Sequence, residues 1–140
     1  MANLFTLTDR LLERALDGVA ARQRVTAHNI ANVNTPGYKR HRLSFEESLH
    51  QAVEKAERRR LAGTVTHPRH IPIGERSSPL ERPFRVERDM TTTMRNDGNN
   101  VDIEAELAQL TKDQVFYQAL ADQVARRYAM LRAVITEGRR

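Results

Sequence analysis

The last third of the chain carries its most regular pattern of apolar positions. From residue 103 onward these positions recur at alternating intervals of four and three, and Gln114 is the one polar residue in the series. Such spacing forms the heptad seam of a long amphipathic helix, which we predict over residues 102–137. Asp102 suits the N-cap and Gly138 the position after the last turn. The seam consists of Ile103, Leu107, Leu110, Tyr117, Ala121, Val124, Tyr128, Leu131 and Ile135.

A second apolar stripe flanks this seam on the same predicted helix. It contains Phe116, Leu120, Met130 and Val134. At a rise of 1.5 Å per residue the helix is about 50 Å long, which is too long for a small globule. Because one partner helix cannot cover both stripes, we expect further helical neighbours from other copies of the chain.

The N-terminal part predicts a second amphipathic helix, over residues 4–32. Thr8 or Asp9 is placed to cap its start. Gly18 lies mid-helix, where glycine costs about 1 kcal/mol relative to alanine. The apolar face of this helix is formed by residues at three-, four- and seven-residue steps, namely Phe5, Leu12, Leu16, Val19, Thr26 and Ile30.

A turn sequence ends the first helix. Asn32 and Asn34 tolerate left-handed geometry, and Pro36 both fixes its own φ and favours an extended Thr35. Proline followed by Gly37 suits the two central positions of a type II turn. We therefore expect the chain to leave the helix at a fixed angle.

Residues 33–100 carry little periodicity beyond that turn. A moderately helical pattern covers 42–60, and short extended pieces are plausible at 84–86 and 91–93. Four of the five prolines fall between Pro68 and Pro83. We expect the isolated monomer to be partly disordered, chiefly between residues 62 and 100.

Together these patterns predict a mainly α fold in a single domain spanning residues 1–140. Two long terminal amphipathic helices, 4–32 and 102–137, are expected to pack as an antiparallel coiled-coil-like pair. The segment 33–100 between them is expected to hold the turn, a short helix and an irregular, partly extended middle.

The amino-acid composition limits the stability of the monomer and the kinds of site that it can hold. Hydrophobic residues make up 39% of the 140 residues, aromatic residues only 5%, and there is no Trp, so the monomer should be weakly stable. The absence of Cys excludes disulfides and thiolate metal sites. The N-terminus lacks the basic and apolar regions of a Sec signal peptide, and no apolar run approaches the roughly 20 residues of a membrane span.

Other chemistries are weakly supported. His67 and His70, with Glu75 nearby, lack a third ligand at a suitable spacing, so no metal or cofactor is expected. No nucleophile–base pair or phosphate loop indicates an enzyme. The net charge of +5, with basic runs at 58–60 and 126–127, leaves a basic helical nucleic-acid-binding protein as the alternative from another class. A salt-sensitive shift with DNA or RNA would favour that alternative, and polymerisation without such a shift would favour a structural role.

Three motifs resemble the flagellar axial proteins, the family of rod, hook and hook-associated subunits. The longest runs from His28 to Arg40 and contains the family signature Asn29, Ile30, Ala31, Asn32, Asn34, Thr35, Pro36, Gly37 and Tyr38. A second match is Asp97-Gly98-Asn99-Asn100-Val101-Asp102, and a looser one is Thr66-His67-Pro68-Arg69-His70-Ile71. Chain length and the stretch 117–135 look most like proximal rod subunits of the B type, with the C type as the nearest competitor.

The resemblance implies a structural subunit that polymerises into the torque-transmitting rod of the basal body. It also implies unfolded export by the flagellar type III apparatus, without a Sec signal, and assembly in the periplasm. The partners would be further copies, other rod subunits and ring or adaptor proteins, and the terminal helices would line the tube. The assembly seam would then comprise Phe5, Leu12, Leu16, Val19, Ile30, Ile103, Leu107, Leu110, Tyr117, Val124, Tyr128, Leu131 and Ile135.

Overall fold

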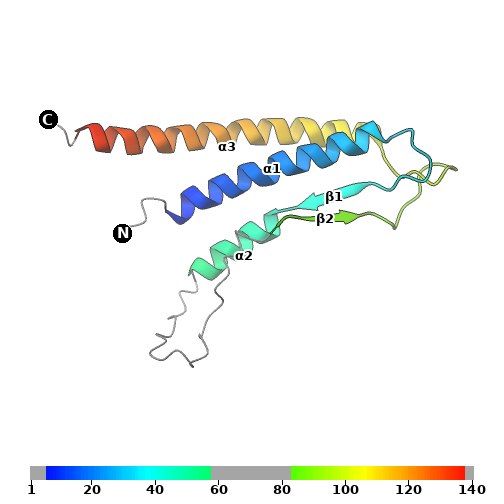
Figure 1. Ribbon diagram of the computed structural model, residues 1–140, viewed down its shortest axis with the longest axis horizontal. Helices are drawn as coiled ribbons and strands as arrows, with labels where there is room; N and C mark the ends of the chain where they lie inside the picture. Colours follow the sequence, from blue (N-terminus) through cyan, green and yellow to red (C-terminus); the bar gives the residue numbers. More distant parts are fainter. Residues whose placement is uncertain (1–5, 58–82, 138–140) are drawn as a thin grey trace, which may run out of the picture.

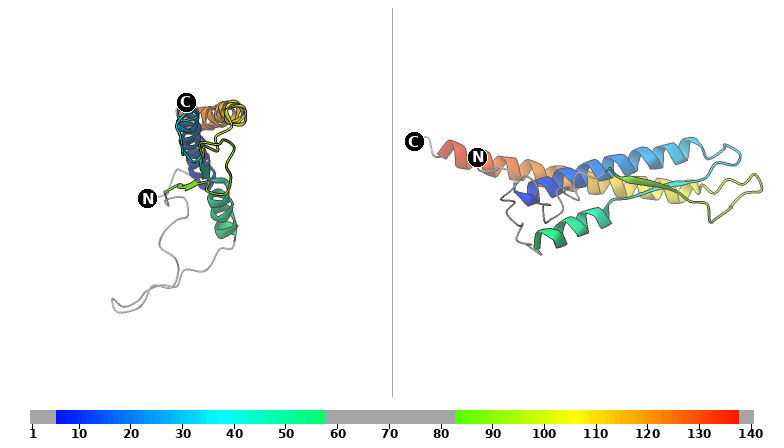
Figure 2. Two further views of the ribbon diagram at one scale, coloured as in Figure 1. Left: turned by 90° about the vertical axis from the view of Figure 1, so that its right-hand side faces the viewer. Right: turned by 60° about the horizontal axis from the view of Figure 1, so that its bottom comes forward.

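The computed structural model describes residues 6–57 and 83–137 of the chain. Two long helices, α1 (Leu7–Ala31) and α3 (Ile103–Glu137), run antiparallel and side by side (Figures 1 and 2). The strands β1 (His41–Ser44) and β2 (Arg85–Arg88) and the helix α2 (Glu46–Glu57) lie along α1 (Figure 1). The predicted mainly α fold, with paired terminal helices and an irregular, partly extended middle, is confirmed.

Helix α1 begins with a capping box. Its N-cap is Thr6, whose hydroxyl accepts a hydrogen bond from the Asp9 N–H, while the Asp9 carboxylate accepts one from the Thr6 N–H at 2.8 Å. The prediction that Thr8 or Asp9 caps the helix is therefore wrong, because the reciprocal pair satisfies two N-terminal donors at once. The predicted seam residue Phe5 lies outside the described residues.

The two strands pair antiparallel, with His41 opposite Arg88 and Ser44 opposite Arg85. The sequence pattern assigned helical character from residue 42, but 42–44 are strand, because strand pairing with a distant segment overrides the local preference. The extended piece predicted at 84–86 overlaps β2, whereas Thr91–Thr93 forms no strand.

The apolar core lies where β1 and the start of α2 meet α1. Val19, Leu43 and Phe45 are buried there, with Val25, Leu49, Phe84 and Leu120 packed against them. A Cβ built on Gly18 would lie 2.5 Å from the Phe45 ring, so the glycine makes room for this aromatic side chain. The residue that looked like a weak point of the helix is a packing requirement.

Candidate assembly surfaces

The turn after α1 has the predicted geometry. The Tyr38 N–H donates to the Thr35 carbonyl at 3.2 Å, and Gly37 has a φ of +70°. With Pro36 and Gly37 at the central positions, these are the features of a type II turn, so this prediction is confirmed. Residues 34–37 are exposed at one end of the molecule (Figure 1).

The side chain of Asn29 connects this turn to β1 and α3 through hydrogen bonds. Its side chain is buried and donates to the His41 carbonyl at 2.8 Å and to the Glu106 carboxylate at 3.1 Å. Its Oδ1 accepts from the His41 N–H and the Tyr38 hydroxyl. Burial and then the nearby Glu106 charge raise the pKa of Tyr38, so the phenol stays a donor at neutral pH. The signature asparagine thus joins α1, β1 and α3.

The second motif, 97–102, lies directly against the first. The Gly37 N–H donates to the Asp97 carbonyl at 2.9 Å. Asn100 is buried, accepts from the Arg40 N–H at 2.7 Å and donates to the Asp89 carbonyl at 2.9 Å. The two sequence motifs therefore form one structural unit at the end of the helix pair.

Buried ion pairs hold α1 and α3 in register. Arg22 of α1 contacts the Asp113 carboxylate of α3, with its Nη2 at 2.7 Å, and also reaches Glu46 of α2. Burial lowers the pKa of Arg22, but the hydrogen bonds that its guanidinium donates to the Asp113 and Glu46 carboxylates raise the pKa by more. Asp113 is only 1% exposed, so this carboxylate depends on its arginine partner.

Two more ion pairs involve α3, one with the segment between α1 and β1 and one with the start of α1. Arg40 contacts Glu106, and Arg127 lies 2.9 Å from Asp9. Hydrogen bonds from Thr6, and then the Arg127 guanidinium, hold the pKa of Asp9 below its ordinary value. The interface between the terminal helices is therefore partly polar, which the apolar heptad pattern did not predict.

These polar contacts shift the inward face of α3 by part of a turn from the predicted seam. Of the predicted seam residues of α3, Leu110, Ala121, Val124 and Leu131 are half-buried. The intervening inward positions are taken by Glu106, Asp113, Leu120 and Arg127, each one residue before a predicted seam position. Five predicted seam residues stay exposed by 41–64%, namely Ile103, Leu107, Tyr117, Tyr128 and Ile135. On α1, Val19 is buried and Leu12, Leu16 and Ile30 are half-buried.

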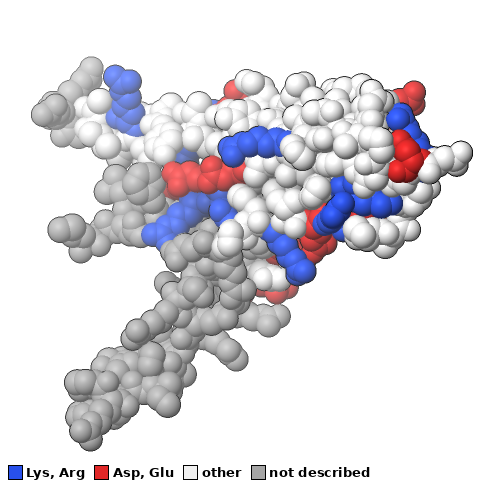
Figure 3. Space-filling view, turned by 45° about the vertical axis from the view of Figure 1, so that its right-hand side comes forward, with Lys and Arg blue, Asp and Glu red and all other residues white. Residues whose placement is uncertain are grey.

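Helix α3 leaves large apolar side chains exposed on both sides of its inward face. In addition to those five residues, Val115, Phe116, Met130 and Val134 are exposed by 43–74%. Figure 3 shows few charged side chains along the upper edge of the molecule, where α3 lies. Packing within the monomer does not account for these exposed apolar side chains. Exposed apolar surfaces of this kind mark interaction sites.

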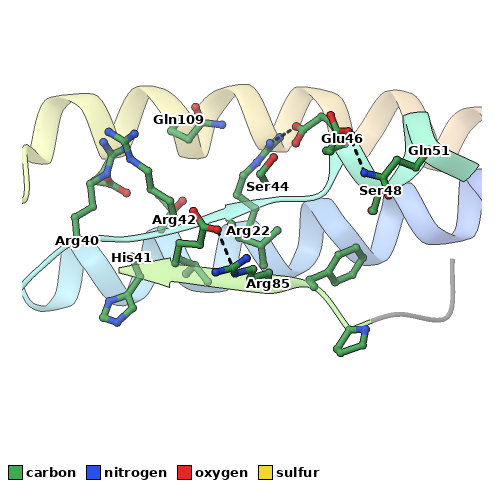
Figure 4. Close-up of a pocket in the computed structure, with 18 residues that line it drawn as sticks. Arg22, Arg40, His41, Arg42, Ser44, Glu46, Ser48, Gln51, Arg85 and Gln109 are labelled. Atoms are coloured by element: carbon green, nitrogen blue, oxygen red, sulfur yellow. Dashed lines mark hydrogen bonds and ion pairs between the residues drawn. The ribbon is translucent and has the colours of Figure 1, made fainter. Parts of the chain in front are cut away.

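A groove of about 860 Å³ lies between α1, α3, β1 and the start of α2 (Figure 4). Its four arginines are all paired: Arg22 with Asp113 and Glu46, Arg40 with Glu106, Arg42 with Asp89, and Arg85 with Glu87. Within 6–57 and 83–137, no three His, Asp or Glu side chains gather as a metal site would need. The candidates His67, His70 and Glu75 lie outside the described residues. No helix among the described residues is long and apolar enough to span a membrane.

Sequence reasoning missed Arg22 and Asn99 as structural residues. Both are polar residues whose importance comes from partners far away in the chain, and a single sequence shows no such pairing. For Gly18, the sequence shows the low helix propensity of glycine but not the contact with Phe45. For Asn99, the available signal is the motif 97–102.

Comparison with known proteins matches these features to one family. A family model described as flagella basal body rod protein matches residues 10–39. The flagellar basal body rod protein FlgB of Bacillus subtilis (strain 168) is 33% identical over 137 residues, covering 98% of this chain and 99% of the relative. FlgB of Borrelia hermsii is 32% identical over 134 residues, covering 95% and 98%. FlgB of Salmonella typhimurium is 34% identical over 112 residues, 78% of each chain. The chain therefore belongs to the FlgB family of flagellar basal body rod proteins.

Proposed function

We propose that this chain, a structural subunit of the proximal rod of the flagellar basal body, polymerises through the exposed apolar surface of α3. Family membership supports the structural role, and no catalytic step is part of it. The observation that carries the mechanism is the set of large apolar side chains, exposed by 41–74%, that a single helix carries on both sides of its inward face.

The energetic argument compares the two sides of α3. Its inward side uses ion pairs at Glu106, Asp113 and Arg127, so few of its large apolar side chains are buried within the monomer. Each one fully buried against a neighbour contributes about 1.5–3 kcal/mol. Several such contacts per subunit would hold a polymer together, although part of this gain offsets the entropy of association.

The signature turn supplies a second contact in this proposal. Asn34, Thr35, Pro36 and Gly37 are exposed, and a Cβ on Gly37 would meet nothing within 4 Å. The fold therefore does not need these surfaces for its own packing. A turn of fixed geometry at one end of each subunit would instead meet a neighbour in the rod.

Partners and location follow from the same proposal. The neighbours are further copies of the chain and related rod subunits, and the base of the rod meets ring or adaptor proteins. Export through the flagellar type III apparatus without a Sec signal brings the chain to the periplasm. The B-type assignment is favoured over the C type because the relatives quoted above are FlgB proteins that match most of the chain. No observation favours nucleic-acid binding.

A paired substitution on α3 tests the apolar contact. Met130 and Val134 lie one helical turn apart and are 57% and 74% exposed, so changing both to Glu should leave the monomer folded. The Glu–Glu repulsion costs only a few tenths of a kcal/mol. The matched control changes both residues to Leu, which keeps the surface apolar.

Both variants are expressed in a strain that lacks the native chain, and their amounts in purified basal bodies are measured. We expect the Glu variant to be stable and exported but absent from rods, and the Leu variant to be incorporated. Normal incorporation of the Glu variant would show that this surface is not a subunit contact.

A further inference from the structure

Asn99 is fully buried, and every one of its polar groups is used. Its backbone N–H donates to the Asp97 side chain at 3.1 Å, and its carbonyl accepts from the N–H groups of Met94 and Arg95. Its side-chain oxygen accepts from the Val101 N–H at 2.8 Å. Asn99 is therefore as constrained as a core side chain, although its motif, 97–102, belongs to a loop.

The amide nitrogen of Asn99 faces the end of α1. It lies 3.1, 3.0 and 2.9 Å from the carbonyl oxygens of Asn32, Val33 and Thr35, respectively. Carbonyls at and just after a helix C-terminus lack intrahelical donors. A side chain 67 residues away along the chain from Asn32 thus helps to cap this helix end, where the Thr35 N–H also donates to the Asn32 carbonyl and Arg95 to the Val33 carbonyl.

The same segment holds the signature turn through its backbone. The Gly37 N–H donates to the Asp97 carbonyl, and Gly98, with a φ of +81°, brings its backbone close to Gly37. The side chain of Asn99 also donates to the carbonyls of Val33 and Thr35, where the chain enters the turn. The turn is therefore held from both halves of the chain: Asp97 and Asn99 contact it from the second half, and Asn29 and Asn32 from the first.

We propose that Asn99 is a positioning residue for the signature turn, which becomes competent for assembly only when the segment 97–100 has docked on the end of α1. This inference rests on the proposed function, in which the turn contacts a neighbouring subunit. Its consequence is that a chain cannot present the turn until residues from both of its halves have met. Incompletely folded subunits are thereby kept from the growing end of the rod.

The chemistry at this position requires an amide. Asp would keep the acceptor for the Val101 N–H, but its carboxylate cannot donate to the carbonyls at the end of α1 and would repel them. Asn99→Asp therefore removes the long-range cap while keeping the local bond. Asn96→Asp is the matched control, because Asn96 is an exposed residue of the same loop.

The first readout is amide hydrogen exchange on the full-length monomer. We expect Asn99→Asp to raise the exchange rates of the Thr35, Gly37 and Tyr38 amides at least about tenfold, while amides in the middle of α1 and α3 stay unchanged. The control should change neither group. Unchanged rates in the turn would overturn the proposal, and so would an equal rise throughout the protein, because Asn99 would then stabilise the whole fold.

The second readout is incorporation into basal bodies, measured in the same strain as the α3 variants. We expect Asn99→Asp to be exported but excluded from rods. If the turn loosens and the variant still assembles normally, the inference fails while the α3 contact can stand. If Asn99→Asp is excluded but the Glu variant at Met130 and Val134 assembles, the α3 contact fails and the positioning role of Asn99 stands.

Discussion

Replacing Gly18 by Ala should destabilise the protein, although helix propensity alone predicts the opposite. The new Cβ would lie 2.5, 2.7 and 2.9 Å from three carbons of the Phe45 ring. This ring is fully buried, with Phe84 at its edge and the Arg22 guanidinium 4.7 Å from its centroid. Because the contact is with a packed ring, the ring or the α1 backbone must move.

The magnitude follows from two opposing effects. Glycine to alanine in a helix interior gains about 1 kcal/mol from propensity. Overpacking a well-filled core costs about 1–3 kcal/mol, and the upper value applies where a rigid ring is displaced. The net expectation for Gly18→Ala is a loss of about 2 kcal/mol, which lowers the urea midpoint by about 1 M at a typical denaturant slope.

Urea unfolding of the monomer, followed by circular dichroism, measures this loss. Ala27→Gly, at an exposed position of the same helix, calibrates the propensity effect and should cost about 1 kcal/mol. In a Phe45→Leu background the clash is relieved, so Gly18→Ala should there become neutral or stabilising. A Gly18→Ala protein more stable than the native chain would refute the packing argument.

Three further predictions concern the turn, the seam and pH. Gly37→Val should cost about 1–3 kcal/mol locally, because valine disfavours the positive φ of this position. The variant should keep the helicity of the monomer, measured by circular dichroism, but should not be incorporated into rods. A loss of helicity that accompanies the loss of incorporation would contradict this prediction. Leu110→Asp places a charge between the terminal helices, so it should lower the free energy of unfolding in urea by at least about 2 kcal/mol and abolish motility. A motile strain would argue against the assignment of Leu110 to the seam. Because the pKa of Asp9 is lower in the folded protein, its carboxylate stabilises the fold above about pH 4, and this stabilisation is lost as the pH falls through the folded pKa. In unfolding experiments, the free energy of unfolding of Asp9→Asn should therefore fall less with acid than that of the native chain. An identical pH dependence in the two proteins would count against the role of Asp9.

The sequence predicted the parts of the fold that have long periodic patterns. The helices expected over 4–32 and 102–137 are α1 (Leu7–Ala31) and α3 (Ile103–Glu137), and the type II turn at Pro36-Gly37 has the expected geometry. Local chemistry is sufficient for these features, because helix periodicity and turn residues act over a few positions.

Features that depend on distant partners could not be predicted in the same way. The strand at 41–44 exists because residues 85–88 pair with it, and Gly18 is needed because Phe45 folds back onto α1. The apolar heptad pattern predicts an inner seam one residue away from Glu106 and Asp113, which in fact face inward in ion pairs. In a single sequence, charged residues that form buried ion pairs cannot be told from surface charges. Whether the exposed half of that seam joins copies of the chain stays a prediction.

The most direct test of the central claim is the protein content of purified basal bodies. Mass spectrometry of basal bodies from cells that produce this chain, after removal of hook and filament, measures whether it is part of the rod. We expect the chain to be present and to stay with the rod fraction. Its absence from intact basal bodies, in cells that contain the chain in quantity, would contradict its role as a rod subunit.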